Sequence, residues 1–178
     1  MNDPLTPKPC FIDLSSLRAL PQKPHPLQSG PIRIRRVVPF IYLSDSRAAE
    51  NIQEIAENNI RYVVYLSKPK KTKRKTNLYN QINCYVSNSP NADITVTLRR
   101  LVKIIKAIVS HRHSVLICCS TGLSLSPTVV IAYLIKAKKL SFQDSFDILQ
   151  QFESRIGPSL SHLLQLKKLE KKIQSTKT

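Results

Sequence analysis

The residues best suited to chemistry lie in one short stretch, residues 118–127, which reads Cys-Cys-Ser-Thr-Gly-Leu-Ser-Leu-Ser-Pro. An apolar run at 114–117 precedes this stretch and another at 128–134 follows it, which predicts a buried strand, a tight loop and a helix. Backbone N–H groups in such a loop can hold an anion at the helix N-terminus. A thiol at the head of the loop, Cys119, is where a nucleophile that attacks phosphorus would sit.

This stretch resembles the signature loop of protein tyrosine phosphatases, Cys-x5-Arg, in its small dual-specificity form. The resemblance implies a nucleophile at Cys119 and, at Ser126, a hydroxyl that assists the leaving thiolate. Cys118 stands where the family has histidine, and Leu125 stands where it has the arginine that grips two phosphoryl oxygens. The phosphate loop implied by the resemblance consists of Cys119, Ser120, Thr121, Gly122, Leu123, Ser124 and Leu125.

The resemblance extends from about residue 32 to residue 173 and includes the run Val-Ser-Asn-Ser-Pro-Asn-Ala-Asp-Ile at 86–94. In the family, a run of this kind carries the aspartate that protonates the leaving group. Here that position is Asn88, which has no titratable proton to give. The nearby carboxylate of Asp93 is better interpreted as a helix N-cap than as a substitute acid.

The two replacements predict that the chain is not an active enzyme. An arginine that stabilises phosphoryl transfer is worth about 10³–10⁵ in rate, and a general acid contributes about 10²–10⁴. We therefore expect a catalytically inactive pseudophosphatase that binds protein partners, such as phosphoproteins or kinases. Two alternatives stay open: a residual protein tyrosine, serine or threonine phosphatase that uses Cys119, and a basic module that binds RNA or phosphoinositides.

Structural interpretations of the same residues also stand. Cys119 can be a small buried apolar residue at the end of a strand. Gly122 suits any tight turn from strand to helix, and Ser124 and Ser126 can cap the following helix without any substrate.

Composition is typical of one soluble intracellular domain, and we expect it in the cytoplasm, the nucleus or both. The chain has 178 residues, of which 42% are hydrophobic, and no apolar run is long enough to predict a membrane span. The four cysteines form neither a disulfide framework nor a paired metal-binding pattern, so no metal or other cofactor is expected. These cysteines are Cys10, Cys84, Cys118 and Cys119.

Charge is the second functional clue, because the formal net charge is +17. Such an excess attracts acidic surfaces; nucleic acid is a less favoured partner, since no aromatic residues interleave with the basic runs. Arg33, Arg35 and Arg36 precede Val37-Val38 and resemble the basic-plus-aliphatic motif that docks on mitogen-activated kinases. The densest basic patch consists of Lys68, Lys70, Lys71, Lys73, Arg74 and Lys75.

Strands that alternate with helices predict an α/β fold with a central, mostly parallel sheet flanked by helices. The resemblance implies the topology of the small dual-specificity phosphatases, in which the signature loop lies between a central strand and a helix. Residues 1–31 are rich in proline and predict a disordered tail, 32–174 form the domain with a basic loop at 68–77, and 175–178 form a second tail.

Periodicity and capping residues place the individual elements. Strands are expected near 38–43, 62–66 and 82–86. Helices are expected from Ser46 to residue 58, from Asp93 to about residue 109, from Pro127 to Lys138, after the capping pair of Ser141 with Asp144, and from Pro158 onward.

Overall fold

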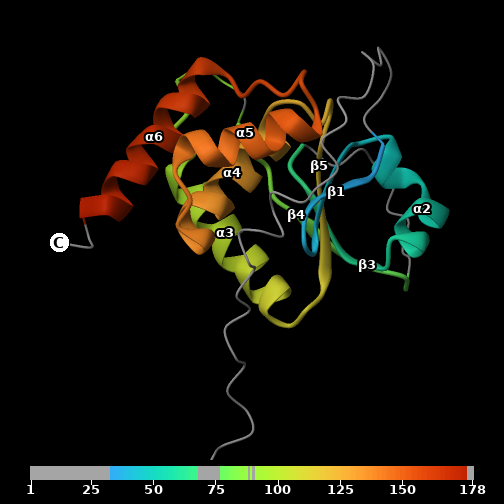
Figure 1. Ribbon diagram of the computed structural model, residues 1–178. Helices are drawn as coiled ribbons and strands as arrows, with labels where there is room; N and C mark the ends of the chain where they lie inside the picture. Colours follow the sequence, from blue (N-terminus) through green and yellow to red (C-terminus); the bar gives the residue numbers. More distant parts are fainter. Residues whose placement is uncertain (1–32, 68–76, 88, 90, 176–178) are drawn as a thin grey trace, which may run out of the picture.

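The computed structural model describes residues 33–67, 77–87, 89 and 91–175 of the chain. The predicted proline-rich tail, the basic patch at 68–75 and Asn88 lie outside the described residues. Within the described part, one sheet carries helices on both faces (Figure 1).

A five-stranded sheet in the order β1-β2-β5-β3-β4 organises the fold. The pairs β2–β5, β5–β3 and β3–β4 are parallel, and the pair β1–β2 is antiparallel, which confirms the predicted mostly parallel sheet. The central strand β5 is buried along nearly its whole length, as expected of a parallel strand that is covered on both faces. The strands are β1 Arg35–Val38, β2 Ile41–Asp45, β3 Ile60–Tyr65, β4 Asn80–Asn83 and β5 Ser114–Cys119.

The helices divide unequally between the two faces (Figure 1). The larger group lies on one side, where α4 packs against both α3 and α6. No described helix is long and apolar enough to cross a membrane. The larger group consists of α3 Thr95–Ser110, α4 Leu125–Lys138, α5 Phe142–Phe152 and α6 Leu160–Ser175; the opposite face carries the 3-10 turn η1 Ala48–Glu50 and the short helix α2 Ile52–Glu57.

Helix α4 is the centre of the larger core. Every residue from Leu125 to Ile135 is buried, so this helix is apolar all round rather than amphipathic. It lies between the sheet and the neighbouring helices (Figure 1), and its first turn follows directly from the loop at the end of β5. The packing of the core therefore fixes where that loop lies.

Several sequence predictions agree with the structure. The predicted inward face of α3 is buried in full. At the start of α5, the Asp144 N–H donates to Ser141 Oγ at 3.0 Å, and the Ser141 hydroxyl donates to Asp144 Oδ2 at 2.7 Å, which confirms the predicted capping pair. The buried residues of the α3 face are Leu98, Leu101, Val102, Ile105, Ile108 and Val109.

The prediction of one continuous helix that begins at Ser46 was wrong. The chain instead forms η1 and α2, which are separated by Asn51, whose side chain accepts a hydrogen bond from Glu54 N and caps α2. The N–H groups of Arg47 and Ala48 donate to Asp45 Oδ1 at 2.9 and 2.8 Å. A carboxylate at the end of β2 thus turns the chain before a continuous helix can start.

His162 on α6 is a buried polar side chain that the sequence analysis did not single out. Its side chain is fully buried, and neither ring nitrogen has a hydrogen-bond partner among the described residues. Burial lowers the pKa of His162 below its ordinary value of 6.5, while a weaker effect of the Ser87 backbone acts in the opposite direction. The folded protein therefore disfavours the charged form of this ring.

We predict that His162→Leu raises the free energy of unfolding by about 1–3 kcal/mol, because it removes two unsatisfied buried nitrogens. With a lowered folded-state pKa, His162 takes up a proton more readily in the unfolded chain, so wild-type stability falls as the pH drops below 6.5. Urea unfolding measured on both sides of that pH should show a smaller decline for His162→Leu. The control, His113→Gln, removes an exposed histidine and should keep the wild-type decline; equal pH dependence in all three proteins would contradict the prediction.

Candidate functional site

The loop between β5 and α4 is the candidate site. β5 ends at Cys119 and α4 begins at Leu125, so the intervening residues turn the chain at the carboxyl end of the central strand. Parallel pairing places Asp45, the last residue of β2, beside Cys119. This edge of an α/β sheet is where ligands are usually bound.

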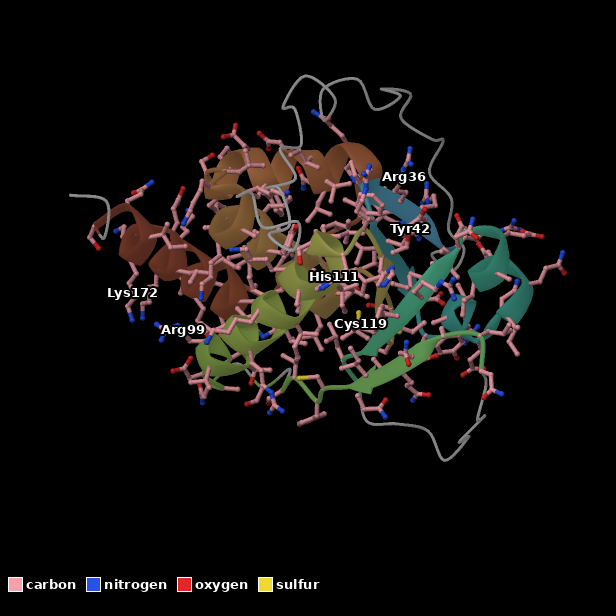
Figure 2. The ribbon with its side chains drawn as sticks, turned by 90° about the horizontal axis from the view of Figure 1, so that it is seen from below. Arg36, Tyr42, Arg99, His111, Cys119 and Lys172 are labelled. Carbon is pink, nitrogen blue, oxygen red and sulfur yellow. The ribbon has the colours of Figure 1, made fainter. Side chains whose placement is uncertain are left out.

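Cys119 lies in the interior, between the sheet and the helices (Figure 2). Its residue exposure is 2%, and its sulfur has two polar neighbours. The backbone N–H of Gly122 donates to Cys119 Sγ at 3.2 Å, and Ser126 Oγ lies 3.2 Å from the same sulfur. The sulfur of the cysteine at the head of the loop is thus in contact with one backbone donor and one hydroxyl.

Cys118 faces a different environment from Cys119. Its side chain belongs to the smaller core cluster on the α2 side of the sheet, and its thiol donates to Val64 O at 3.5 Å. Burial raises the pKa of Cys118 well above its ordinary value, and the charges of Cys119, Asp45 and Glu50 act in the same direction. Cys118 therefore remains a protonated thiol, while Cys119 is the cysteine turned toward the loop.

Gly122 brings the loop against the backbone of β2. Its φ of 71° lies in the left-handed region, and a Cβ built on it would lie 2.9 Å from both Ser44 C and Ser44 O. Neither condition suits a residue with a side chain. The close approach is also what orients the Gly122 N–H toward Cys119 Sγ.

Ser124 and Ser126, the two serines that the sequence offered as helix caps, differ in their surroundings. Ser124 occupies the N-cap position of α4, but its side chain makes no capping hydrogen bond. Ser126 is fully buried inside the first turn, where its hydroxyl contacts Cys119. The capping interpretation therefore does not describe Ser126, whose side chain is directed at the thiol.

Leu125, where the resemblance implies arginine, belongs to the hydrophobic core. Its exposure is 8%, and it packs within the large apolar cluster that includes Val129 and Ile131. The side chain therefore helps to anchor α4. At this sequence position the chain supplies core packing in place of a guanidinium.

Asp93 does not occupy the cap position that the sequence predicted. The N-cap of α3 is Ile94, one residue later, while Asp93 Oδ1 accepts a hydrogen bond from Thr95 N at 2.8 Å. Hydrogen bonds with the side chain and then the backbone of Thr95 lower the pKa of the exposed Asp93 carboxyl, and Lys168 and Lys172 contribute in the same direction. An ionised carboxylate in this role is a poor proton donor, which agrees with its structural interpretation.

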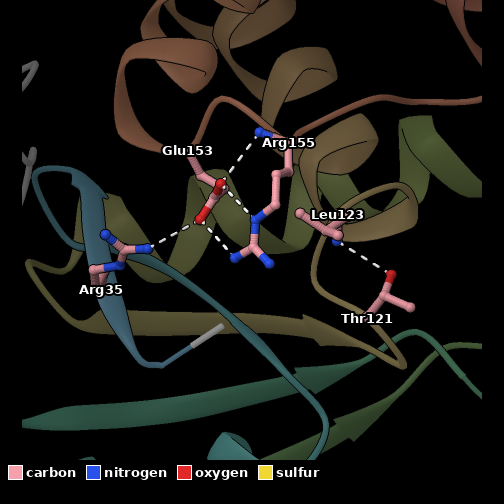
Figure 3. Close-up of polar contacts among 5 residues, drawn as sticks. All are labelled: Arg35, Thr121, Leu123, Glu153 and Arg155. Carbon is pink, nitrogen blue, oxygen red and sulfur yellow. Dashed lines mark hydrogen bonds and ion pairs between the residues drawn. The ribbon is translucent and has the colours of Figure 1, made fainter. Parts of the chain in front are cut away.

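An ion-pair cluster beside the loop was not predicted from the sequence. Glu153 binds Arg155 through two contacts, at 2.9 and 3.0 Å, and its Oε2 also lies 3.2 Å from Arg35 Nη2. Gly157 N donates to Leu123 O at 3.0 Å, which ties this segment to the loop. Figure 3 shows the Arg155 side chain between Glu153 and Leu123.

The cluster carries two positive charges against one negative charge. The pKa of Glu153 is lowered, chiefly by its hydrogen bond from Arg155, so the carboxylate is ionised and pairs with both guanidinium groups. Little in the sequence indicated that Arg35 and Arg155 share one carboxylate, because they are 120 positions apart in the chain. No three His, Cys, Asp or Glu side chains gather closely enough to hold a metal ion among the residues described.

Comparison with known proteins identifies what the chain resembles. The family described as "Dual specificity phosphatase, catalytic domain" matches residues 41–172. Human dual specificity protein phosphatase 5 is 30% identical over 147 residues, which make up 82% of this chain and 37% of that protein. The human dual specificity protein phosphatase 9 is 26% identical over 142 residues, 78% of this chain and 36% of that protein.

Solved structures show the same fold. The crystal structure of human DUSP28 superposes with a TM-score of 0.74 at 23% sequence identity, and the alignment covers 80% of this chain and 99% of that one. The chain spans less than two-fifths of the length of the two curated relatives, 37% and 36% respectively.

These findings contradict the prediction that the chain is not an enzyme. The matching family and its relatives are phosphatases, and the loop of this chain keeps buried cysteines at 118 and 119, which points to a potential enzyme. The sequence argument weighed two missing side chains, Arg at 125 and Asp at 88. It gave no weight to the Gly122 N–H and the Ser126 hydroxyl that the fold brings to Cys119 Sγ, neither of which depends on those side chains.

We predict that Gly122→Ala lowers the free energy of unfolding by about 2 kcal/mol, because alanine is strained at this φ and its Cβ would contact the Ser44 carbonyl. Gly157→Ala is the matched control, since the nearest atom to its Cβ lies 4.0 Å away and its φ is not positive. Urea unfolding should give a lower free energy of unfolding for Gly122→Ala than for Gly157→Ala. Equal stability would show that the loop does not depend on this close approach.

Proposed function

This chain belongs to the dual specificity phosphatase catalytic domain family, and we propose that it is a cysteine-dependent phosphatase acting on phosphate monoesters of proteins. The observation that supports this proposal best is the placement of Cys119 Sγ, 3.2 Å from Gly122 N and 3.2 Å from Ser126 Oγ. A buried thiol held by a backbone donor at the start of a helix is suited to attack an anion that the same loop binds.

The proposed reaction has two steps. The Cys119 thiolate attacks phosphorus, an S–P bond forms, and the P–O bond to the leaving group breaks with its electron pair on oxygen. Water then attacks the phosphocysteine, releases inorganic phosphate and regenerates the thiolate. The Ser126 hydroxyl stabilises the departing thiolate by a hydrogen bond, a role that its distance from Cys119 Sγ supports.

The leaving group determines which substrates suit this site. The sequence has no carboxylic acid at Asn88, and the Asp93 carboxylate is bound to Thr95 N with a lowered pKa. A phenol, with a pKa of about 10, leaves far more readily without a proton donor than an aliphatic alcohol does. We therefore propose phosphotyrosine and other aryl phosphates as preferred substrates, ahead of phosphoserine and phosphothreonine.

Arg155 is the proposed source of positive charge for the phosphate. Leu125 is packed in the core, and the Gly157–Leu123 hydrogen bond places the segment of Arg155 against the loop (Figure 3). Glu153 restrains the guanidinium with two hydrogen bonds, which reduces the entropy lost when it orders around an anion. Arg35, on the same carboxylate, adds a second charge.

Protein partners follow from this proposal only as a class. Phosphoproteins fit as substrates, and the family assignment supports them. The suggested kinase-docking motif is supported less well, because Arg35 is paired with Glu153 and stacks over Phe152, while Val37 and Val38 are buried. Those contacts give Arg35, Val37 and Val38 structural roles within the fold, so their presence requires no kinase partner.

We predict that the purified protein hydrolyses p-nitrophenyl phosphate and that Cys119→Ser lowers the rate by about 10³-fold or more, because the nucleophile is lost. Cys118→Ser is the matched control: it alters the adjacent thiol, which faces Val64 O, and should keep most of the activity. Release of inorganic phosphate measures both. Absence of turnover in the wild type, or equal loss in the two variants, would refute a Cys119-dependent phosphatase.

We further predict that Arg155→Ala raises KM for the aryl phosphate by roughly 10- to 100-fold, the effect of losing a charged hydrogen bond. Arg155→Lys should retain part of the affinity because it keeps the charge. Steady-state kinetics with circular dichroism as a folding check test this role, and an unchanged KM in Arg155→Ala would exclude it.

A further inference from the structure

The outer face of α6 combines exposed leucines with a row of lysines. Leu160 is 73% exposed and Leu164 is 53% exposed, although both are large apolar side chains. Spacings of three and four residues place them on the same side of the helix as four exposed lysines. These lysines are Lys167, Lys168, Lys171 and Lys172.

Helix α3 repeats this arrangement. Val96 in its first turn is 74% exposed, and the exposed positions that follow on the same side carry only positive charge apart from an alanine and the terminal serine. No acidic residue occurs anywhere in the helix. The cations are Arg99, Arg100, Lys103 and Lys106.

Helix α6 lies against the start of α3. Gln165 joins them, because it accepts from Ile94 N at 2.9 Å and donates to Ala92 O at 2.8 Å. A shallow cavity of about 370 Å³ lies at this junction, lined among others by Thr95 and Lys168. The cavity lining also includes Asp93 and Lys172, and in the view of Figure 2 Arg99 and Lys172 lie toward the same edge of the molecule.

The cations of α3 lie close enough to Lys136 on the neighbouring helix α4 to disfavour its charged form. The pKa of Lys136 on α4 is lowered, first by burial and then by the charges of Arg99, Lys103 and Lys139. Hydrogen bonds with Thr95 and, more weakly, the charges of Lys168 and Lys172 lower the pKa of Asp93 just before α3. A surface that gathers like charges in this way is stabilised by an anionic partner.

The exposed aliphatic side chains narrow the kind of partner. Single-stranded nucleic acid is bound through aromatic side chains that stack on bases, and the exposed positions of α3 and α6 hold no aromatic residue. An amphipathic surface of leucine, valine and lysine instead matches the boundary of a lipid bilayer, where acyl chains lie directly beneath charged headgroups.

We propose that the α3/α6 surface, formed by the exposed residues named above on the two helices, docks on anionic lipid membranes. The lysines and arginines contact acidic headgroups, and Leu160, Leu164 and Val96 enter the apolar boundary beneath them. Docking of this kind concentrates the protein at a membrane without a spanning helix. The proposal is independent of the phosphatase chemistry at Cys119.

Sedimentation of the full 178-residue protein with lipid vesicles tests the proposal. The wild type should bind vesicles of mixed phosphatidylcholine and phosphatidylserine and should not bind phosphatidylcholine alone. Lys168→Glu with Lys171→Glu should weaken the partition coefficient by roughly 30-fold or more. Leu160→Ser with Leu164→Ser, which changes no charge, should weaken it by roughly tenfold.

A matched control separates this surface from the general positive charge of the chain. Lys70→Glu with Lys71→Glu changes the net charge by the same amount at the basic patch and should bind nearly as well as the wild type. Equal loss in this control would overturn the proposal. So would undiminished binding by the leucine variant, an outcome that would indicate a site for a polyanion such as RNA; circular dichroism confirms that each variant is folded.

Discussion

The close contact between Gly122 and the backbone of Ser44 is the constraint on which the site depends. Because no side chain separates the two segments, the loop after β5 can lie directly against the end of β2 and turn the Gly122 N–H toward Cys119 Sγ. Parallel pairing of β2 with β5 brings these segments together, and the buried helix α4 holds the far end of the loop in place. The position of the thiol is thus a consequence of sheet order and core packing.

Residues from distant segments of the chain come together around the loop. Leu125 is packed in the core, and the segment tied to the loop by Gly157 carries Arg155, which Glu153 holds together with Arg35. A carboxylate shared by two guanidinium groups leaves one net positive charge in this cluster. Reasoning from the signature motif alone treated the missing arginine as decisive, and the family assignment contradicted that conclusion.

The accuracy of the sequence predictions followed the range of the interactions involved. The buried face of α3 and the Ser141–Asp144 cap were predicted correctly, because periodicity and capping act within a few residues. The helix expected from Ser46 failed because the Asp45 carboxylate binds the next N–H groups and turns the chain first. His162 was overlooked because only its tertiary neighbours determine that both ring nitrogens are buried without partners among the described residues.

The sequence alone determined the α/β class, the loop from strand to helix, the cysteine at its head and the strongly positive charge, because each of these is local or additive along the chain. Tertiary structure decided which of the two adjacent cysteines faces the loop, what surrounds Leu125, and which cations meet beside the loop or across α3 and α6. Those features depend on side chains that the packing of the sheet and helices brings together from distant positions. Packing in three dimensions is not encoded in the spacing of any single motif.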